Sequence, residues 1–196
     1  MPQPPPMMPP VNGPMLYELS LRWAGLLTGG LLLAGHGYAF WKGAETRNLL
    51  RAFPRSRVAG TILIALAALW CVWVVATMDL GEFVRYKTLL LLAIPASAWL
   101  LWRYVEEFLA VRALGMLMLL GAEPLLGAAF HRPETSRLFL VSLVYVWIIA
   151  GMFWVGMPYL LRDAIQWATA SESRWKIAAA GGAAYGALLC ALAFRW

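Results

Sequence analysis

Six long apolar runs divide this chain, and they limit what it can fold into more than any other feature. They lie at residues 19–40, 58–78, 80–102, 105–130, 138–160 and 177–194. A helix needs about 20 predominantly apolar residues to cross the hydrocarbon core of a bilayer, and each run is near or above that length. Hydrophobic residues make up 62% of the chain and charged residues 13%, which is typical of a membrane protein. We therefore expect an all-α fold, a polytopic membrane helical bundle of about six transmembrane helices.

The first 15 residues differ from the rest in composition. The stretch MPQPPPMMPPVNGP is rich in proline, uncharged, and lacks the basic region and cleavage motif of a conventional signal peptide. Such a segment favours an extended or disordered tail over residues 1–15. The remaining residues, 16–196, are expected to form a single transmembrane helical domain.

Basic residues are distributed unequally between the two ends of the predicted spans. Ten of them fall on the side of the first loop: Lys42, Arg47, Arg51, Arg55, Arg57, Arg103, Arg112, Arg162, Arg174 and Lys176. The opposite side carries six: Arg22, Arg85, Lys87, Arg132, Arg137 and Arg195. Because cytoplasmic loops carry the excess of Lys and Arg, we expect a bacterial inner (plasma) membrane protein with both termini outside. The net charge of +6 is explained by these loops, and we expect no nucleic-acid partner.

Three stretches lie at uncertain boundaries of the predicted spans. Asp79, followed three residues later by Glu82, has the pattern of a helix N-cap with its acidic partner, so the third span is expected to begin there. The link to the fourth span, at 102–104, is so short that the two helices form either a hairpin or one sharply bent element. After Pro158, the stretch LRDAIQW is expected to lie along the interface as an amphipathic turn.

Small residues recur along the last apolar run. Gly182, Gly186 and Cys190 follow each other every four residues, and Gly25 with Gly29 makes a weaker version in the first run. Small residues at this spacing let two helix backbones approach closely. We expect these faces to pack within the bundle, in preference to binding a membrane-protein partner or forming a homo-oligomer.

The fourth run carries two charges that hydrocarbon should exclude, Arg112 and Glu123. They are eleven residues apart, which places them about 20° apart around one helix and about 16 Å apart along it. They therefore share a face, expected to point into the bundle, but cannot form a salt bridge. A carboxylate in lipid is costly unless it is protonated or paired, so Glu123 is the best candidate functional residue. The alternative is a Glu that bonds to a neighbouring helix or reaches interfacial water.

A second charged group can be assembled on the cytoplasmic side. It contains Arg103, Glu106, Glu107, Arg162 and Asp163. Arg112 lies at the same depth, and His36 is a further candidate member. Mixed charges at one depth could bind a lipid headgroup or an anionic metabolite. Ordinary solvation, and local ion pairs of Arg103 with Glu106 or Glu107, explain the same residues more simply.

Established catalytic and cofactor patterns do not occur in the sequence. There is no Walker A loop, GxSxG elbow or HExxH motif, so an enzyme is the less favoured class. Cys71 and Cys190 lie inside apolar runs and predict neither a disulfide framework nor a metal site. His36 and His131 fall at opposite ends of their spans, which disfavours one haem between them, and we expect no cofactor.

Two hypotheses for the function remain. In the first, the chain is a non-catalytic membrane subunit or scaffold whose charges lock the bundle or dock a partner. In the second, it is a small proton- or cation-linked transporter or channel that uses Glu123. The second needs a polar path from Glu123 towards Arg112, but residues 116–120 between them are all apolar, which favours the first.

Overall fold

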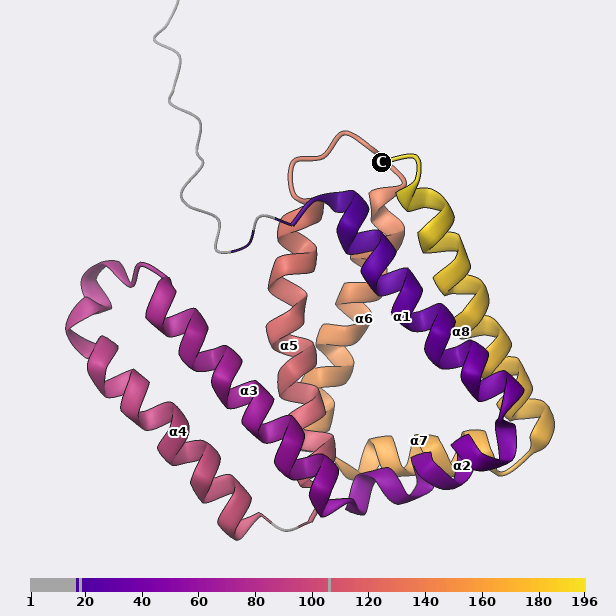
Figure 1. The fold of residues 1–196 in the computed structure, drawn as a ribbon, viewed down its shortest axis with the longest axis horizontal. Helices are drawn as coiled ribbons and strands as arrows, with labels where there is room; N and C mark the ends of the chain where they lie inside the picture. The colour runs from indigo at the N-terminus through magenta and orange to yellow at the C-terminus, as the bar shows by residue number, and fades with distance from the viewer. Residues whose placement is uncertain (1–16, 18, 106) are drawn as a thin grey trace, which may run out of the picture.

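A computed structural model describes residues 17, 19–105 and 107–196, so the proline-rich tail and Glu106 lie outside the described residues. Within this part of the chain every regular element is a helix. In chain order these are α1 (Leu21–Trp41), α2 (Gly43–Ala52), η1 (Phe53–Arg55), α3 (Arg57–Thr77), η2 (Gly81–Tyr86), α4 (Lys87–Tyr104), α5 (Leu109–Ala129), α6 (Arg137–Gly156), α7 (Tyr159–Thr169) and α8 (Glu172–Ala193), shown in Figure 1.

Five helical segments are long and apolar enough to cross a membrane. They are α3, η2 with α4, α5, α6 and α8. Helix α1 has the same length as α3 but is not among the five, since five glycines, Arg22 and His36 lower its hydropathy. The described chain is therefore an all-helical fold with several candidate membrane spans, as the apolar runs predict.

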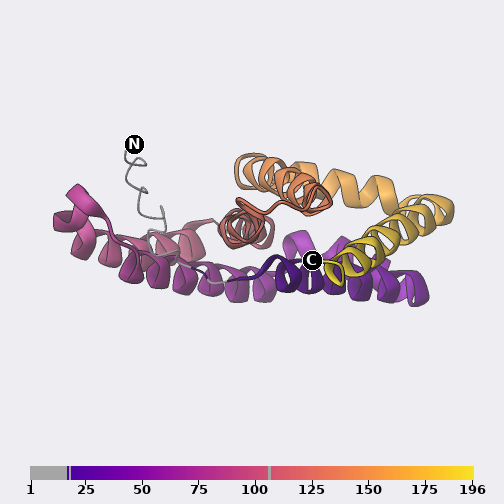
Figure 2. The ribbon, with the colours of Figure 1, turned by 90° about the horizontal axis from the view of Figure 1, so that it is seen from above.

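The long helices form a flat arrangement of pairs. Helices α1 and α8 lie side by side and antiparallel, and α5 and α6 form a second antiparallel pair (Figure 1). Helix α3 packs on α5, and α4 packs on the outer side of α3. Seen from above, α1, α3 and α4 lie in one layer with α6 and α7 on one side of it, so the molecule is thin (Figure 2).

Close backbone contacts between glycines hold the pairs together. A Cβ atom added to Gly186 would lie 2.7 Å from the carbonyl oxygen of Gly29, and one added to Gly115 would lie 2.8 Å from that of Gly151. The α8 stripe of Gly182, Gly186 and Cys190 therefore faces α1, which confirms the expected packing within the bundle. At the upper end, buried residues of α1, α5, α6 and α8 meet in the largest apolar core, around Ala24, Ala128, Leu140, Val144 and Leu189.

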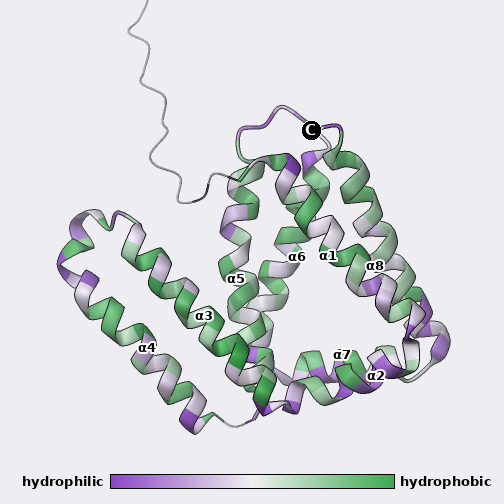
Figure 3. Cartoon of the chain, in the orientation of Figure 1, coloured by the Kyte–Doolittle hydropathy of each residue, from purple (hydrophilic) through white to green (hydrophobic). Residues whose placement is uncertain are grey.

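Two short helices form a base at the lower end of the molecule. Helices α2 and α7 run across the ends of the long helices, and both contain hydrophilic residues among hydrophobic ones (Figure 3). Arg51 of α2 joins them, because its Nε donates to Thr169 Oγ1 at 2.8 Å and its Nη2 donates to the Thr169 carbonyl at 2.7 Å. The expected amphipathic turn after Pro158 is thus a full helix, α7, whereas α2 was not anticipated from the first loop.

The boundaries of the third span differ in detail from the sequence prediction. Asp79 Oδ1 accepts a hydrogen bond from the backbone N–H of Gly81 at 3.0 Å, and the chain then forms a 3-10 helix before α4 begins. Asp79 therefore stabilises a turn ahead of the 3-10 helix and does not cap α4 itself, whereas the sequence predicted an N-cap. After Tyr104 the chain reverses direction, so α4 and α5 are two antiparallel helices and not one bent helix. They do not pack mainly on each other, because α3 lies between them (Figure 1).

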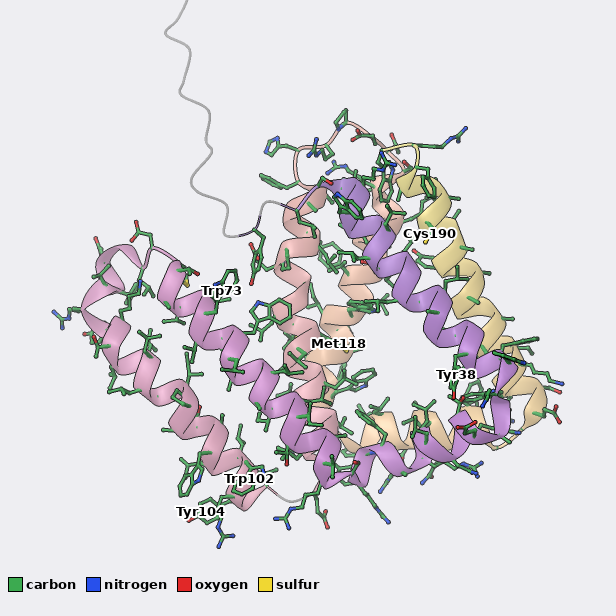
Figure 4. The ribbon with its side chains drawn as sticks, in the orientation of Figure 1. Tyr38, Trp73, Trp102, Tyr104, Met118 and Cys190 are labelled. Carbon is green, nitrogen blue, oxygen red and sulfur yellow. The ribbon has the colours of Figure 1, made fainter. Side chains whose placement is uncertain are left out.

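Among the long helices, α4 packs least against the rest of the fold. It packs mainly on α3, and none of its 18 residues is buried. Its lower end carries Trp102 and Tyr104, which project at the foot of the helix (Figure 4). Tryptophan and tyrosine favour the membrane interface, so the aromatic foot of α4 is typical of a span end.

Candidate functional site

Arg112 lies in the first turn of α5, against the last turn of α6. Its Nη1 donates to the carbonyl oxygen of Val155 at 2.5 Å. The last carbonyls of a helix have no partner within that helix and carry its negative dipole end, so a guanidinium there acts as a cap. The side chain is half-buried, and its Nε is buried without a hydrogen-bond partner. Arg112 therefore has a structural partner, as expected for a residue that faces the bundle.

Glu123 lies on the same side of α5 but is exposed, so the expectation that it faces the interior is wrong. It lines an apolar groove of about 500 Å³ between α5 and α6, together with Leu119, Ala122, Leu126, Gly127, Phe130 and Ile148. Among the described residues, no ion pair or hydrogen bond reaches its carboxylate. Six residues separate it from the end of α5, which places it about 9 Å below that end.

The two charges of α5 are therefore independent of each other. Arg112 contacts the end of α6 at Val155, whereas Glu123 shares a groove with Ile148, farther along the same helix. Between them, Gly115 packs against Gly151, and the Leu119 side chain packs on Gly151. This close contact between α5 and α6 separates the two charges.

The charged group predicted at the cytoplasmic side is only partly assembled. Glu107 and Arg162 line one pocket of about 250 Å³, together with Arg55 and Phe108. Asp163 is linked to it through Arg162, whose Nη2 lies 2.7 Å from Asp163 Oδ1. Arg103 is not part of the pocket and lies over the ring of its neighbour Tyr104, at 5.8 Å from the centroid. Glu106 lies outside the described residues.

Two residues of this pocket, Arg55 and Phe108, were missed by the sequence analysis. Phe108 has φ of 59° and ψ of 24°, a left-handed conformation that a bulky side chain seldom adopts. It precedes α5 and supplies an aromatic face, over which Arg162 lies at 5.8 Å from the centroid. Arg55 ends η1, more than 50 residues from Glu107 in sequence, so no local pattern could have connected them.

An apolar groove of about 310 Å³ runs between α3, α4 and α5. Its lining includes Ile64, Ala98, Leu101, Met116 and Leu119. Leu109, the residue after Phe108, packs in one cluster with Ile64, and Leu101 packs against that cluster. Leu109, next to Phe108 of the charged pocket, therefore packs against residues that form the wall of the groove.

The histidines do not form a ligand pair. His36 lies in α1 against Gly182 of α8, and its Nδ1 is 2.9 Å from the carbonyl oxygen of Leu32. His131 follows α5 at the other end of the molecule, and its ring stands edge-on to that of Phe130. In the part of the chain that the structure describes, no three His, Cys, Asp or Glu side chains are grouped as metal ligands would be.

No protein-family model, no curated protein and no solved structure matches this chain.

Proposed function

We propose that this chain is a six-span protein of a bacterial inner membrane, with both termini outside, that acts as a non-catalytic subunit. In this proposal it binds a transmembrane helix of another membrane protein along the groove that contains Glu123. The sixth span is α1, which packs along the full length of α8, as its antiparallel contacts from Gly25 to Ala39 indicate. The excess of basic residues at the α2–α7 end supports a cytoplasmic position for that end.

The observation that carries the proposal is the exposed carboxylate of Glu123. Ionisable residues inside a membrane are costly, and almost all of them face a protein interior or pair with another group. Glu123 does neither among the described residues, because its neighbours in the groove are apolar. A second protein that covers this groove would remove the carboxylate from lipid.

The groove also favours a helix as the occupant. Ala122 and Gly127 lie along it, and a Cβ added to Gly127 would meet no atom within 4 Å. Small residues permit close approach of two helices, and polar side chains stabilise such contacts by hydrogen bonds. We therefore expect the partner helix to carry a Lys, an Arg or an amide side chain at the depth of Glu123. A second copy of this chain would instead place two carboxylates together.

Transport through Glu123 receives less support. The groove around Glu123 and the charged pocket at the other end have no lining residue in common. Residues 116–120 between Glu123 and Arg112 are apolar, so they offer no chain of groups for a proton or cation.

A photocrosslinking experiment in native membranes tests the proposal. A photoreactive amino acid at Leu126, beside Glu123, should give a discrete adduct with one membrane protein. The same amino acid at Leu31, exposed on α1, serves as the control and should give none. Glu123→Lys should abolish the adduct at Leu126, and a reversed charge at the contacting position of the partner should restore it.

Two results would contradict this function. An adduct that survives Glu123→Lys would show that the carboxylate does not determine binding. Cation or proton flux in proteoliposomes of the chain alone, lost in Glu123→Gln, would assign Glu123 to transport instead.

A further inference from the structure

The charged pocket at the foot of α5 has the composition of an ion-binding site rather than of a packing defect. Its walls carry two guanidinium groups, Arg55 and Arg162, one carboxylate, Glu107, and the ring of Phe108. Its volume of about 250 Å³ is below the range of about 300–1,000 Å³ for sites that enclose a whole small molecule. It therefore suits a compact ionic group.

The two arginines differ in how they are held. Arg162 has partners within the fold, because its Nε donates to Asp163 Oδ1 at 2.8 Å while its guanidinium lies over the Phe108 ring. Arg55 is exposed, and no hydrogen bond or ion pair occupies its guanidinium among the described residues. Arg55 thus retains all of its donors, and a phosphate is the group whose geometry matches a guanidinium best.

The neighbours of the pocket point to a lipid as the source of that phosphate. The pocket lies where η1, the α4–α5 link and α7 converge, at the end of the long helices where hydrophilic residues gather (Figures 1 and 3). Leu109, the residue after Phe108, packs in one apolar cluster with Ile64 and Leu101, and both of these line the apolar groove between α3, α4 and α5. One molecule with a phosphate at the pocket and an acyl chain in the groove would contact both.

Glu107 determines which headgroup fits. A purely anionic headgroup would place its charge beside this carboxylate, which costs binding energy. A phosphate that bears a primary ammonium would satisfy both signs of charge, because the ammonium can donate hydrogen bonds to Glu107.

We propose that this pocket binds the phosphoethanolamine headgroup of a membrane phospholipid, with Arg55 and Arg162 on the phosphate and Glu107 on the ammonium. This site is at the opposite end of α5 from Glu123, and it does not depend on the proposed partner helix.

The test is a binding titration of the purified full-length chain in detergent with short-chain lipids that share the same acyl chains. Phosphatidylethanolamine should bind most tightly, ahead of phosphatidylcholine, whose quaternary ammonium has no N–H to donate. Arg55→Gln should weaken binding of both lipids by about tenfold, through loss of a charge-assisted hydrogen bond. Glu107→Gln should reduce the preference for phosphatidylethanolamine over phosphatidylcholine, because it replaces the charged acceptor to which only the primary ammonium can donate hydrogen bonds.

The matched control is Arg174→Gln, at the same end of the molecule but outside the pocket, where the guanidinium lies over Trp167. It should leave both affinities unchanged. Equal affinities for the parent chain and Arg55→Gln would overturn the site. Tighter binding of phosphatidylglycerol than of phosphatidylethanolamine would overturn its assignment to an ammonium-bearing headgroup. Equal binding of glycerophosphoethanolamine, which lacks acyl chains, would overturn the role of the groove and assign the pocket to a soluble headgroup.

Discussion

Arg112 and Glu123, the two charged residues of α5, differ in their contacts with the rest of the fold. Arg112 has a reason within the fold, because its guanidinium caps the end of α6 through the Val155 carbonyl. Glu123 has no such partner in the described chain. The sequence placed both on one face, but only contact with α6 distinguishes them.

Replacement of Arg112 should therefore weaken the isolated protein. In Arg112→Met, the Val155 carbonyl loses its charged donor, and we expect the free energy of unfolding to fall by about 1–3 kcal/mol. Thermal unfolding in detergent micelles, followed by circular dichroism, measures the change. Arg174→Met is the control, because that side chain is exposed at the start of α8 and its contact is with the Trp167 ring, away from α6. An unchanged melting temperature in Arg112→Met would show that the cap contributes nothing.

Replacement of Glu123 should have the opposite consequence. In Glu123→Leu an unpaired carboxylate is removed from the apolar groove, so we expect the isolated chain to keep or increase its stability. The same unfolding measurement checks this result. A loss of stability comparable to that of Arg112→Met would mean that Glu123 has a structural partner in the fold, and it would weaken the case for a docking role.

At the scale of helices, the spacing of small residues predicts contacts better than it predicts partners. The α8 stripe at Gly182, Gly186 and Cys190 predicted close packing against another helix, and that helix is α1. The choice between α1 and a second molecule depends on the path of the chain, which spacing alone does not contain.

Two glycines of α8 allow this contact to be tested with a matched pair. Gly186→Leu would force a side chain against Gly29 and Leu33, because even a Cβ would lie 2.6 Å from Leu33 N. Overpacking of this kind costs about 1–3 kcal/mol or more. At Gly181 a Cβ meets nothing within 4 Å, so Gly181→Leu should be tolerated. Folded yield and melting temperature of the two variants check the expectation, and equal losses would argue against the α1–α8 contact.

The base formed by α2 and α7 depends on one side chain that joins two short helices. Arg51→Met would remove both of its hydrogen bonds to Thr169, and we expect faster amide hydrogen exchange in α2 and at the end of α7. Arg47→Met is the control, because Arg47 Nε donates to Gly43 within its own helix. Exchange that rises equally in both variants would show that the link is not specific.

For the whole molecule, the sequence predicted the helical class and the positions of the long helices, because these depend on local hydropathy. After Pro158 it predicted an amphipathic turn, where the structure has the longer helix α7. The pocket at the foot of α5 was only half predicted, since Arg55 reaches Glu107 through the tertiary fold and Phe108 through an unusual backbone conformation. The flat arrangement of the helices was not predicted, because an apolar sequence does not distinguish a buried helix from one such as α4, none of whose residues is buried.

The arrangement of the two ends makes a definite prediction about topology. Asn48 of α2 and Ser173 of α8 are exposed near the base of the molecule, whereas Glu82 and Thr135 are exposed at the opposite end. In a Cys71→Ala, Cys190→Ala background, single cysteines at Glu82 and Thr135 should react with an impermeant thiol reagent on intact cells. Cysteines at Asn48 and Ser173 should react only after the membrane is opened, since the basic end is expected to face the cytoplasm. The reverse pattern would invert the orientation and place Glu123 near the cytoplasmic side.

Labelling of Asn48 and Thr135 from the same side would contradict the six-span arrangement, because those positions lie at opposite ends of the long helices.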